Sequence, residues 1–156
     1  MPLERVERYE NSLELMSKLL TIVLPSDGEV KRADQEVLTR CRELADEGGH
    51  TPAAAIIAPD TSDHVADVER YGAEAVYTVE APIFAEGHLT PLLDATTTVI
   101  DEVDPRVAAF SFSETVGELL GALAVHTDAA ALPEVTSFEL GDDGGVDAVR
   151  PVMAAK

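Results

Sequence analysis

The sequence predicts an α/β protein with three α/β/α layers around a mostly parallel sheet, similar to adenine nucleotide alpha hydrolase-like folds, and with a C-terminal antiparallel hairpin. Two observations favour the layered sheet. Short apolar runs alternate four times with helical stretches. These runs are continuously apolar instead of alternating with polar residues, which is typical of strands buried on both faces. A third observation favours the hairpin, because the final part of the chain has turn residues and no helical period.

The length of 156 residues favours one folded domain, which would bury roughly two-thirds of the surface that its unfolded chain exposes. We expect residues 1–19 to form an N-terminal helical extension, because apolar residues there fall at loose helical spacing and Asn11 with Glu14 fits a capping box. Residues 20–156 are then expected to form a single α/β domain.

Four strand-helix pairs are expected in order along that domain. The strands are the runs LLTIVLP, AAAIIAP, EAVYTVE and RVAAFSFS. The helices that follow them are expected over residues 30–47, 62–70, 89–103 and 115–124. In the first helix the apolar residues make one face, and Gly48-Gly49 marks its end.

The stretch LPEVTSFELGDDGGVDAVRPV predicts the hairpin, with its turn at Asp142, Asp143, Gly144 and Gly145. We expect this hairpin at the edge of the main sheet. An edge strand with unpaired backbone groups favours pairing with a partner.

The charge of the chain excludes one class of partner. Thirty acidic residues stand against 11 basic ones, for a formal net charge of −19. Nucleic acid binding depends on lysine and arginine side chains that displace counterions, so no nucleic acid partner is expected. The acidic, lysine-poor composition is typical of a halophilic protein in a salt-rich cytoplasm.

The single cysteine, Cys41, rules out a disulfide framework and favours a reducing compartment. It falls within an expected amphipathic helix, where we interpret it as a small buried hydrophobic residue. No signal peptide and no membrane insertion are expected, because the first residues are charged and no apolar run is long enough to cross a bilayer. A cytoplasmic location follows as an expectation.

Familiar catalytic and cofactor motifs are missing from the sequence. No glycine-rich dinucleotide fingerprint follows the first strand, and no Walker-type loop occurs. The four histidines have no metal-ligand spacing, and His64 with Asp67 is expected to be a solvated surface pair. We therefore expect no catalytic residue and no metal site.

Ligands of open α/β sheets bind at the carboxyl ends of the strands. An adenine-nucleotide-binding module is therefore an alternative hypothesis. Its candidate binding residues are those that follow the expected strands: Ser26, Asp27, Asp60, Ser113 and Thr115. Thr115 with Glu118 also fits a capping box, so the same residues can simply begin a helix. A hydrolase built on Ser113 and His126 is a third hypothesis, although no nucleophile elbow surrounds Ser113.

Four phrases, in this order, give the chain a resemblance to a known family. They are LTRCRELADEGG, ERYGAEAVYTVE, SETVGELLGALAVHTDAAALPEVTSFEL and the closing VRPVMAAK. The chain resembles the N-terminal domain of the electron transfer flavoprotein alpha subunit, from near Leu20 to Lys156. It departs from that family at Val116-Gly117-Glu118, where the family has an arginine, and at Ala154-Ala155, where it has a glycine pair.

This resemblance implies a non-catalytic scaffold domain in an electron-transfer assembly. In that family a second domain of the alpha chain holds the flavin, and the resemblance leads us to expect that this flavin-binding C-terminal domain is absent here. FAD is then expected in the assembly and not on this chain alone, with AMP on a partner subunit. The implied partners are a beta-type subunit, a flavin-bearing domain or chain and, indirectly, acyl-CoA or other dehydrogenases. The hairpin and the N-terminal helix are the surfaces expected to pack against them.

Overall fold

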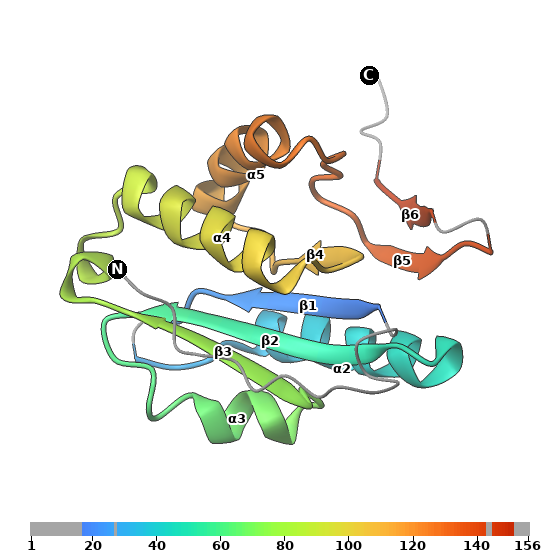
Figure 1. The fold of residues 1–156 in the computed structure, drawn as a ribbon, viewed down its shortest axis with the longest axis horizontal. Coiled ribbons are helices and arrows are strands. Elements are labelled where there is room, and N and C mark those ends of the chain that lie inside the picture. Colours follow the sequence, from blue (N-terminus) through green and yellow to red (C-terminus); the bar gives the residue numbers. More distant parts are fainter. Residues whose placement is uncertain (1–16, 27, 143–144, 152–156) are drawn as a thin grey trace.

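A computed structural model describes residues 17–26, 28–142 and 145–151, and shows three layers (Figure 1). The middle layer is a four-stranded parallel sheet in the order β3-β2-β1-β4. Its strands are β1 (Lys18–Val23), β2 (Thr51–Ala58), β3 (Ala75–Glu80) and β4 (Val107–Ala109). The predicted parallel three-layer fold is confirmed.

The two central strands hold the core. β2 is buried along all eight residues, TPAAAIIA, and it pairs with β1 from Lys18 opposite Thr51 to Val23 opposite Ile56. β4 joins the other side of β1 along three positions. The continuous apolar run of β2 is explained by its place, since a strand with a neighbour on each side and helices on both faces meets no water.

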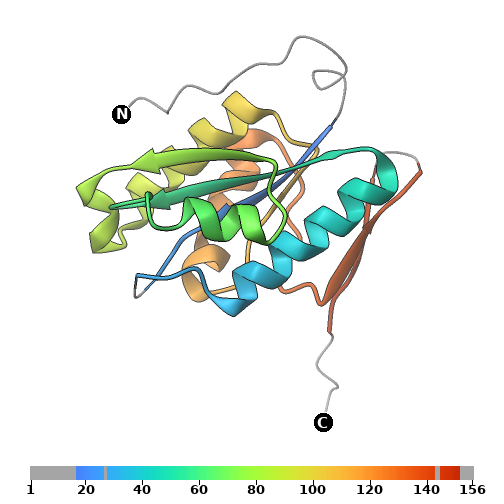
Figure 2. The same ribbon diagram turned by 90° about the horizontal axis from the view of Figure 1, so that it is seen from below.

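Helices cover both faces of the sheet (Figures 1 and 2). On one face lie α2 (Arg32–Gly48) and the short α3 (Val65–Arg70); on the other lie the 3-10 turn η1 (Pro82–Glu86), α4 (Leu89–Val103) and α5 (Glu114–Thr127). Alternate side chains of β1 pack into the helix layers on opposite faces of the sheet. Leu20 and Ile22 pack toward α4 and α5, while Val23 packs toward α2 and α3.

The boundaries predicted from the sequence are correct for one helix, α4, and differ at the start of another, α3. α4 spans Leu89–Val103 as predicted, and it ends where Asp104 takes the left-handed conformation, φ 50°. α3 begins at Val65, because residues 62–64 form a turn instead of the expected first helical turn. β1 begins at Lys18. A helix was expected over residues 1–19, and residues 1–16 of that segment lie outside the described residues.

The hairpin is not at the edge of the main sheet, so that prediction is wrong. β5 (Ser137–Leu140) and β6 (Val146–Val149) pair antiparallel in a separate two-stranded sheet. Phe138 and Leu140 pack against a cluster that includes Cys41 and Leu44 of α2. Residues 143 and 144 of the predicted turn lie outside the described residues.

Two arginines connect the hairpin to the layered domain. The Arg40 Nε and Nη2 atoms donate to the Phe138 carbonyl at 3.1 and 2.9 Å. Arg106, which precedes β4, donates from Nη2 to the Gly141 carbonyl at 3.2 Å. These contacts hold the hairpin beside α2 and near the amino ends of the strands, on the right in Figure 1.

Gly72 is a position where only glycine fits. Its φ is +123°, and an added Cβ would lie 2.7 Å from Cβ of Arg42 on α2. We expect Gly72→Ala to lower the free energy of unfolding by roughly 1–3 kcal/mol, since it combines backbone strain with a steric clash. Urea unfolding measures this change.

Gly121→Ala in α5 is the matched control. An added Cβ at Gly121 meets nothing within 4 Å, and alanine in an exposed helix should stabilise the fold by about 0.5–1 kcal/mol. An equal effect of the two substitutions would contradict the proposed close approach of the Gly72 loop to α2.

Candidate functional site

The strands end together at one edge of the sheet, on the left in Figure 1. Because β1 has β2 on one side and β4 on the other, the order of the strands reverses between β1 and β4. In open α/β sheets this reversal point opens the crevice in which ligands bind. The chemistry of this crevice therefore decides what the domain can hold.

A carboxylate of the chain itself lies at this reversal point, between α2 and the segment that follows β4. Asp34, in the first turn of α2, is 4% exposed. The hydroxyl of Ser111, which follows β4, donates to Asp34 Oδ1 at 2.6 Å. The backbone N–H of Lys31 donates to Asp34 Oδ2 at 3.3 Å. Asp34 thus takes up one backbone N–H at the start of this helix and the hydroxyl of Ser111, two donors that a bound anion could otherwise use.

Burial shifts the protonation of Asp34. Desolvation raises the pKa of its carboxyl group above 3.8, although the hydrogen bonds from Ser111 and Lys31 and the charge of Lys31 act in the opposite direction. An ionised Asp34 would repel a phosphate or diphosphate group at this position. The residues present therefore do not fit the diphosphate of FAD or the phosphates of a nucleotide in this crevice.

The predicted binding residues at the ends of β1 and β2 are engaged in local turns. The carbonyl of Ser26 accepts a hydrogen bond from the N–H of Glu29 at 3.2 Å. The Asp60 carboxylate accepts from the N–H of Ser62 at 3.0 Å and from its hydroxyl at 2.7 Å, and both bonds lower the pKa of Asp60. Asp27 lies outside the described residues.

The predicted residues after β4 mark the start of α5. Ser113 is the N-cap, and its hydroxyl accepts from the N–H of Val116 at 3.2 Å. The predicted capping box of Thr115 with Glu118 is wrong, because the N-cap is Ser113, two residues earlier, and Thr115 is an exposed residue of the first turn. Among the described candidates, no side chain bonds to another candidate.

The serine and histidine of the hydrolase hypothesis lie at opposite ends of α5. Thirteen helical steps between Ser113 and His126 correspond to about 20 Å. The His126 Nδ1 atom lies 2.8 Å from the Ala122 carbonyl, in the last turns of the same helix. The two residues therefore cannot form a nucleophile-base pair within this chain.

Two other titratable residues, His64 and Cys41, are buried in the fold. His64, the N-cap of α3, is buried, 6% exposed, so the expected solvated pair with Asp67 is wrong. Cys41 is buried as predicted, and desolvation raises the pKa of its thiol. Within residues 17–26, 28–142 and 145–151, no group of three or more His, Cys, Asp or Glu side chains could hold a metal ion.

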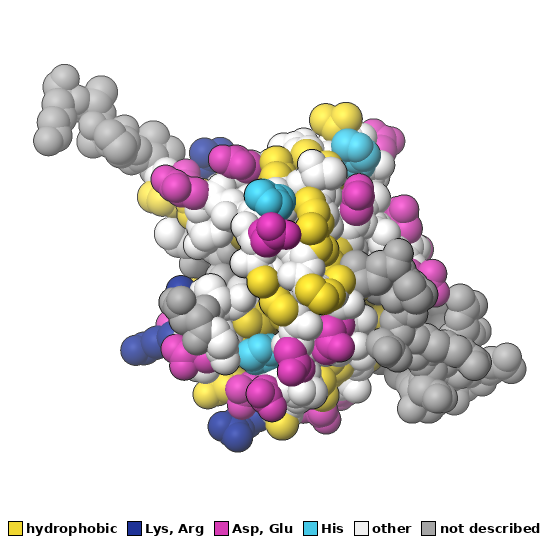
Figure 3. All heavy atoms as spheres, turned by 90° about the vertical axis from the view of Figure 1, so that its left-hand side faces the viewer, with side chains coloured by type: hydrophobic (Ala, Val, Ile, Leu, Met, Phe, Trp, Pro, Cys, Tyr) yellow, Lys and Arg dark blue, Asp and Glu magenta, His cyan; other side chains and the backbone are white. Residues whose placement is uncertain are grey.

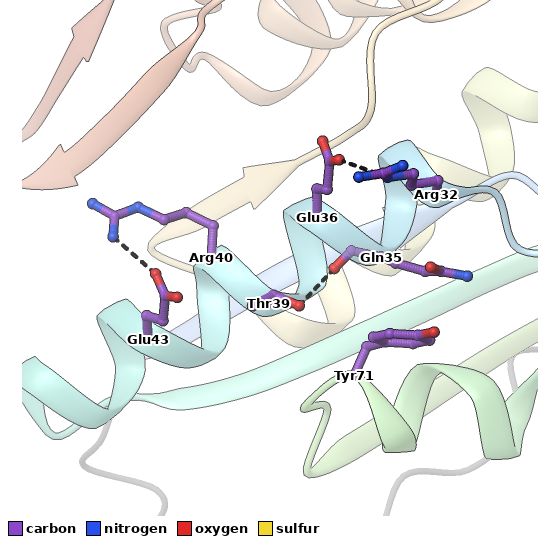
Figure 4. A pocket seen from close by; sticks show the side chains of 7 residues that line it. All are labelled: Arg32, Gln35, Glu36, Thr39, Arg40, Glu43 and Tyr71. Atoms are coloured by element: carbon purple, nitrogen blue, oxygen red, sulfur yellow. Dashed lines mark hydrogen bonds and ion pairs between the residues drawn. The ribbon is translucent and has the colours of Figure 1, made fainter.

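A shallow open groove of about 410 Å³ runs along the outer face of α2 and reaches Tyr71 (Figure 4). Its charged groups are paired along the helix. Arg32 pairs with Glu36 at 3.3 Å and Arg40 pairs with Glu43 at 3.2 Å, all with partly or largely exposed side chains. This pattern indicates a solvated helix surface instead of a substrate site.

Comparison with known proteins shows the family of the chain. Residues 19–156 match the family described as "Electron transfer flavoprotein domain". The chain belongs to the electron transfer flavoprotein family. The resemblance predicted from the sequence phrases is thereby confirmed at the level of the family.

The chain is also similar to Protein FixB of Rhizobium meliloti (strain 1021). The two are 28% identical over 130 residues, which cover 81% of this chain and 37% of FixB. This chain thus spans well under half the length of the relative that it matches. In the part of this electron transfer flavoprotein domain that the structure describes, no helix is long and apolar enough to cross a membrane.

Sequence reasoning missed the pair of Asp34 and Ser111. They are 77 positions apart, and neither belongs to a recognised motif. A carboxylate three residues after Lys31 was a visible capping signal for α2. The partner of that carboxylate depends on β4 lying beside β1, which no local pattern specifies.

Asp34→Asn tests the buried carboxylate. The folded-state pKa of Asp34 is raised, so its contribution to stability is present below the ordinary aspartate pKa of about 4 and is lost as pH rises through the folded pKa. Asparagine does not titrate. The free energy of unfolding of the variant, relative to wild type, should therefore increase between pH 4 and pH 7 in urea titrations.

Asp60→Asn is the control, with the opposite sign. The folded-state pKa of Asp60 is lowered, so the carboxylate stabilises the wild-type fold above its unfolded pKa. The free energy of unfolding of Asp60→Asn, relative to wild type, should therefore decrease as pH rises. If the difference in unfolding free energy between Asp34→Asn and wild type does not change with pH, the carboxyl group of Asp34 is not desolvated.

Proposed function

We propose that this chain is the non-catalytic scaffold domain of an electron transfer flavoprotein alpha subunit, which packs with a beta-type subunit and with a flavin-bearing domain. The match over residues 19–156 carries this proposal. The similarity to FixB supports it. The self-filled crevice fits it too, since a domain whose own carboxylate occupies the ligand position works through protein contacts.

In this assembly FAD is held by the flavin-bearing domain or chain, and AMP by the partner subunit. This chain contributes rigid surfaces that set the position of the flavin. Electrons pass from acyl-CoA or other dehydrogenases to the flavin without a redox step on this chain. The acidic surface and few lysines suit a salt-rich cytoplasm, which is the location that we propose.

The hairpin offers one packing surface. The Gly141 N–H donates to the Gly145 carbonyl at 2.9 Å, just before the first residue pair of the ladder. From this bond, alternate residue pairs of β5 and β6 are hydrogen-bonded to each other. In an antiparallel pair, the backbone groups of alternate residues point away from the partner strand. Those of Val146 and Ala148 therefore point outward along the free edge of β6, where a strand of a partner can add.

The N-terminal extension is the second proposed packing surface. It lies outside the described residues as far as residue 16, so its helix stays a prediction.

The adenine-nucleotide-binding alternative also stays a prediction. The hydroxyl of Ser113 at a helix start favours it, while the buried Asp34 and the acidic residues around the crevice oppose it. Heat released on titration with AMP or ATP would support this alternative, and no heat would dismiss it.

Native purification from the host in high salt tests the scaffold proposal. We expect a yellow complex with the absorbance of an oxidised flavin, in which this chain is accompanied by a beta-type subunit and a flavin-bearing chain. A colourless monomer in the host extract would contradict the proposal.

Ala148→Pro adds a test of the hairpin edge. The N–H of Ala148 points outward, so proline removes no bond inside the hairpin but blocks the addition of a strand. We expect less complex than with wild type, whereas Ala148→Val should retain the complex. Thermal unfolding of both purified variants checks that they are folded.

A further inference from the structure

Arg106 holds the turn end of the hairpin, at the amino ends of the strands. Its backbone N–H donates to the Lys18 carbonyl at 2.9 Å, which fixes its main chain beside β1. Its Nη2 atom donates to the Gly141 carbonyl at 3.2 Å, directly after β5. Its Nε atom is buried and bonds to none of the described residues. The guanidinium is therefore only partly satisfied, so the loss of one of its bonds can displace it.

The same guanidinium contacts His50, the residue before β2. The Arg106 Nη1 atom lies 3.4 Å from Nε2 of His50. The imidazole ring lies against the last residue of α2, since an added Cβ on Gly48 would be 2.7 Å from both Cδ2 and Nε2 of the ring. The His50 N–H donates to the Ala45 carbonyl at 2.9 Å. Arg106 thus bridges a fixed histidine and the hairpin.

The contact between Arg106 and His50 requires a neutral imidazole. A guanidinium can only donate, so His50 must accept at Nε2 and carry its hydrogen on Nδ1. Protonation turns Nε2 into a donor and places two cations beside each other. Burial, and secondly the charge of Arg106, lower the pKa of His50 below 6.5. The contact is therefore present above that pH and is lost as pH falls through the lowered pKa.

No carboxylate offsets a charge on His50 within the described residues. None of the ion pairs between these residues includes His50 or Arg106. Asp46 of α2 pairs with Arg42 at 3.1 Å, and Glu139 of β5 lies 4.0 Å from Arg40. The other charged residues of the elements around His50 are partly or fully exposed: Lys18, Glu47, Asp104, Asp142 and Asp147.

The second anchor of the hairpin does not involve a histidine. Arg40 donates twice to the Phe138 carbonyl, at 3.1 and 2.9 Å, and its Nη1 atom donates to Glu43 at 3.2 Å. Phe138 also packs against the cluster that includes Leu44 of α2. The Phe138 end of the hairpin therefore stays attached when Arg106 moves.

We propose that His50 and Arg106 form a proton-sensitive latch for the hairpin. While His50 is neutral, Arg106 bridges the imidazole and the Gly141 carbonyl, and the turn end of the hairpin is closed onto the domain. A proton taken from solvent by Nε2 of His50 displaces the guanidinium and releases Gly141, so the hairpin opens about the bonded Phe138. This inference goes beyond the proposed function and does not depend on it, because it concerns contacts within this chain.

The test is an NMR pH titration of the full chain from about pH 8 to about pH 5, the range in which histidines titrate. In wild type, the carbonyl carbon of Gly141 should shift with the same midpoint as the ring protons of His50, below pH 6.5. The carbonyl carbon of Phe138 should not follow that midpoint. In His50→Gln, which keeps a neutral acceptor but cannot titrate, the shift of Gly141 with this midpoint should disappear.

A histidine at the other end of the strands supplies the matched control. Figure 3 looks onto the carboxyl edge of the sheet, where histidine side chains lie among acidic ones. His88 follows η1, and its Nε2 atom lies 3.8 Å from Glu86 instead of beside a guanidinium. His88→Gln should therefore leave the titration of Gly141 unchanged.

Arg106→Met gives a second readout that does not depend on the hairpin. Removing the guanidinium should raise the pKa of His50 toward 6.5. An unchanged pKa of His50 in this variant would overturn the latch, because Arg106 would then not act on the imidazole. A Gly141 titration that persists in His50→Gln, or a wild-type Gly141 signal that does not follow His50, would overturn it as well.

Discussion

The hydrogen bond between Ser111 and Asp34 joins two parts of the molecule that are far apart in sequence. It connects the end of β4 to the first turn of α2 and does so inside the crevice where the strand order reverses. The position normally used by a ligand is thereby filled by the chain. The same bond fixes the start of the segment that leads from β4 into α5.

This arrangement fits the proposed scaffold role of the domain. Nucleotide sites of this class need free N–H groups and positive potential at the ends of the strands. Here Asp34 accepts from an N–H group of α2, and Ser113 and Asp60 use their oxygens on their own turns. The edge of β6, toward the amino ends of the strands, remains as a surface for protein contacts.

Elements set by local patterns were predicted well from the sequence. The boundaries of α4 were correct because its apolar period is clear, and the parallel sheet followed from its unbroken apolar runs. The place of the hairpin was not predictable, since it depends on Arg40 and Arg106 reaching the carbonyls of Phe138 and Gly141. The candidate site was predicted only in part: its location at the strand ends was inferred, but its central residues were not.

A double-mutant cycle of Asp34→Ala and Ser111→Ala tests the central contact most directly, with unfolding free energies measured in urea at pH 7. If the two side chains are bonded in a buried site, the two single substitutions should not add, and the coupling energy should be about 1–3 kcal/mol. Additivity within about 0.3 kcal/mol, the value for independent sites, would contradict the buried contact that joins α2 to the end of β4.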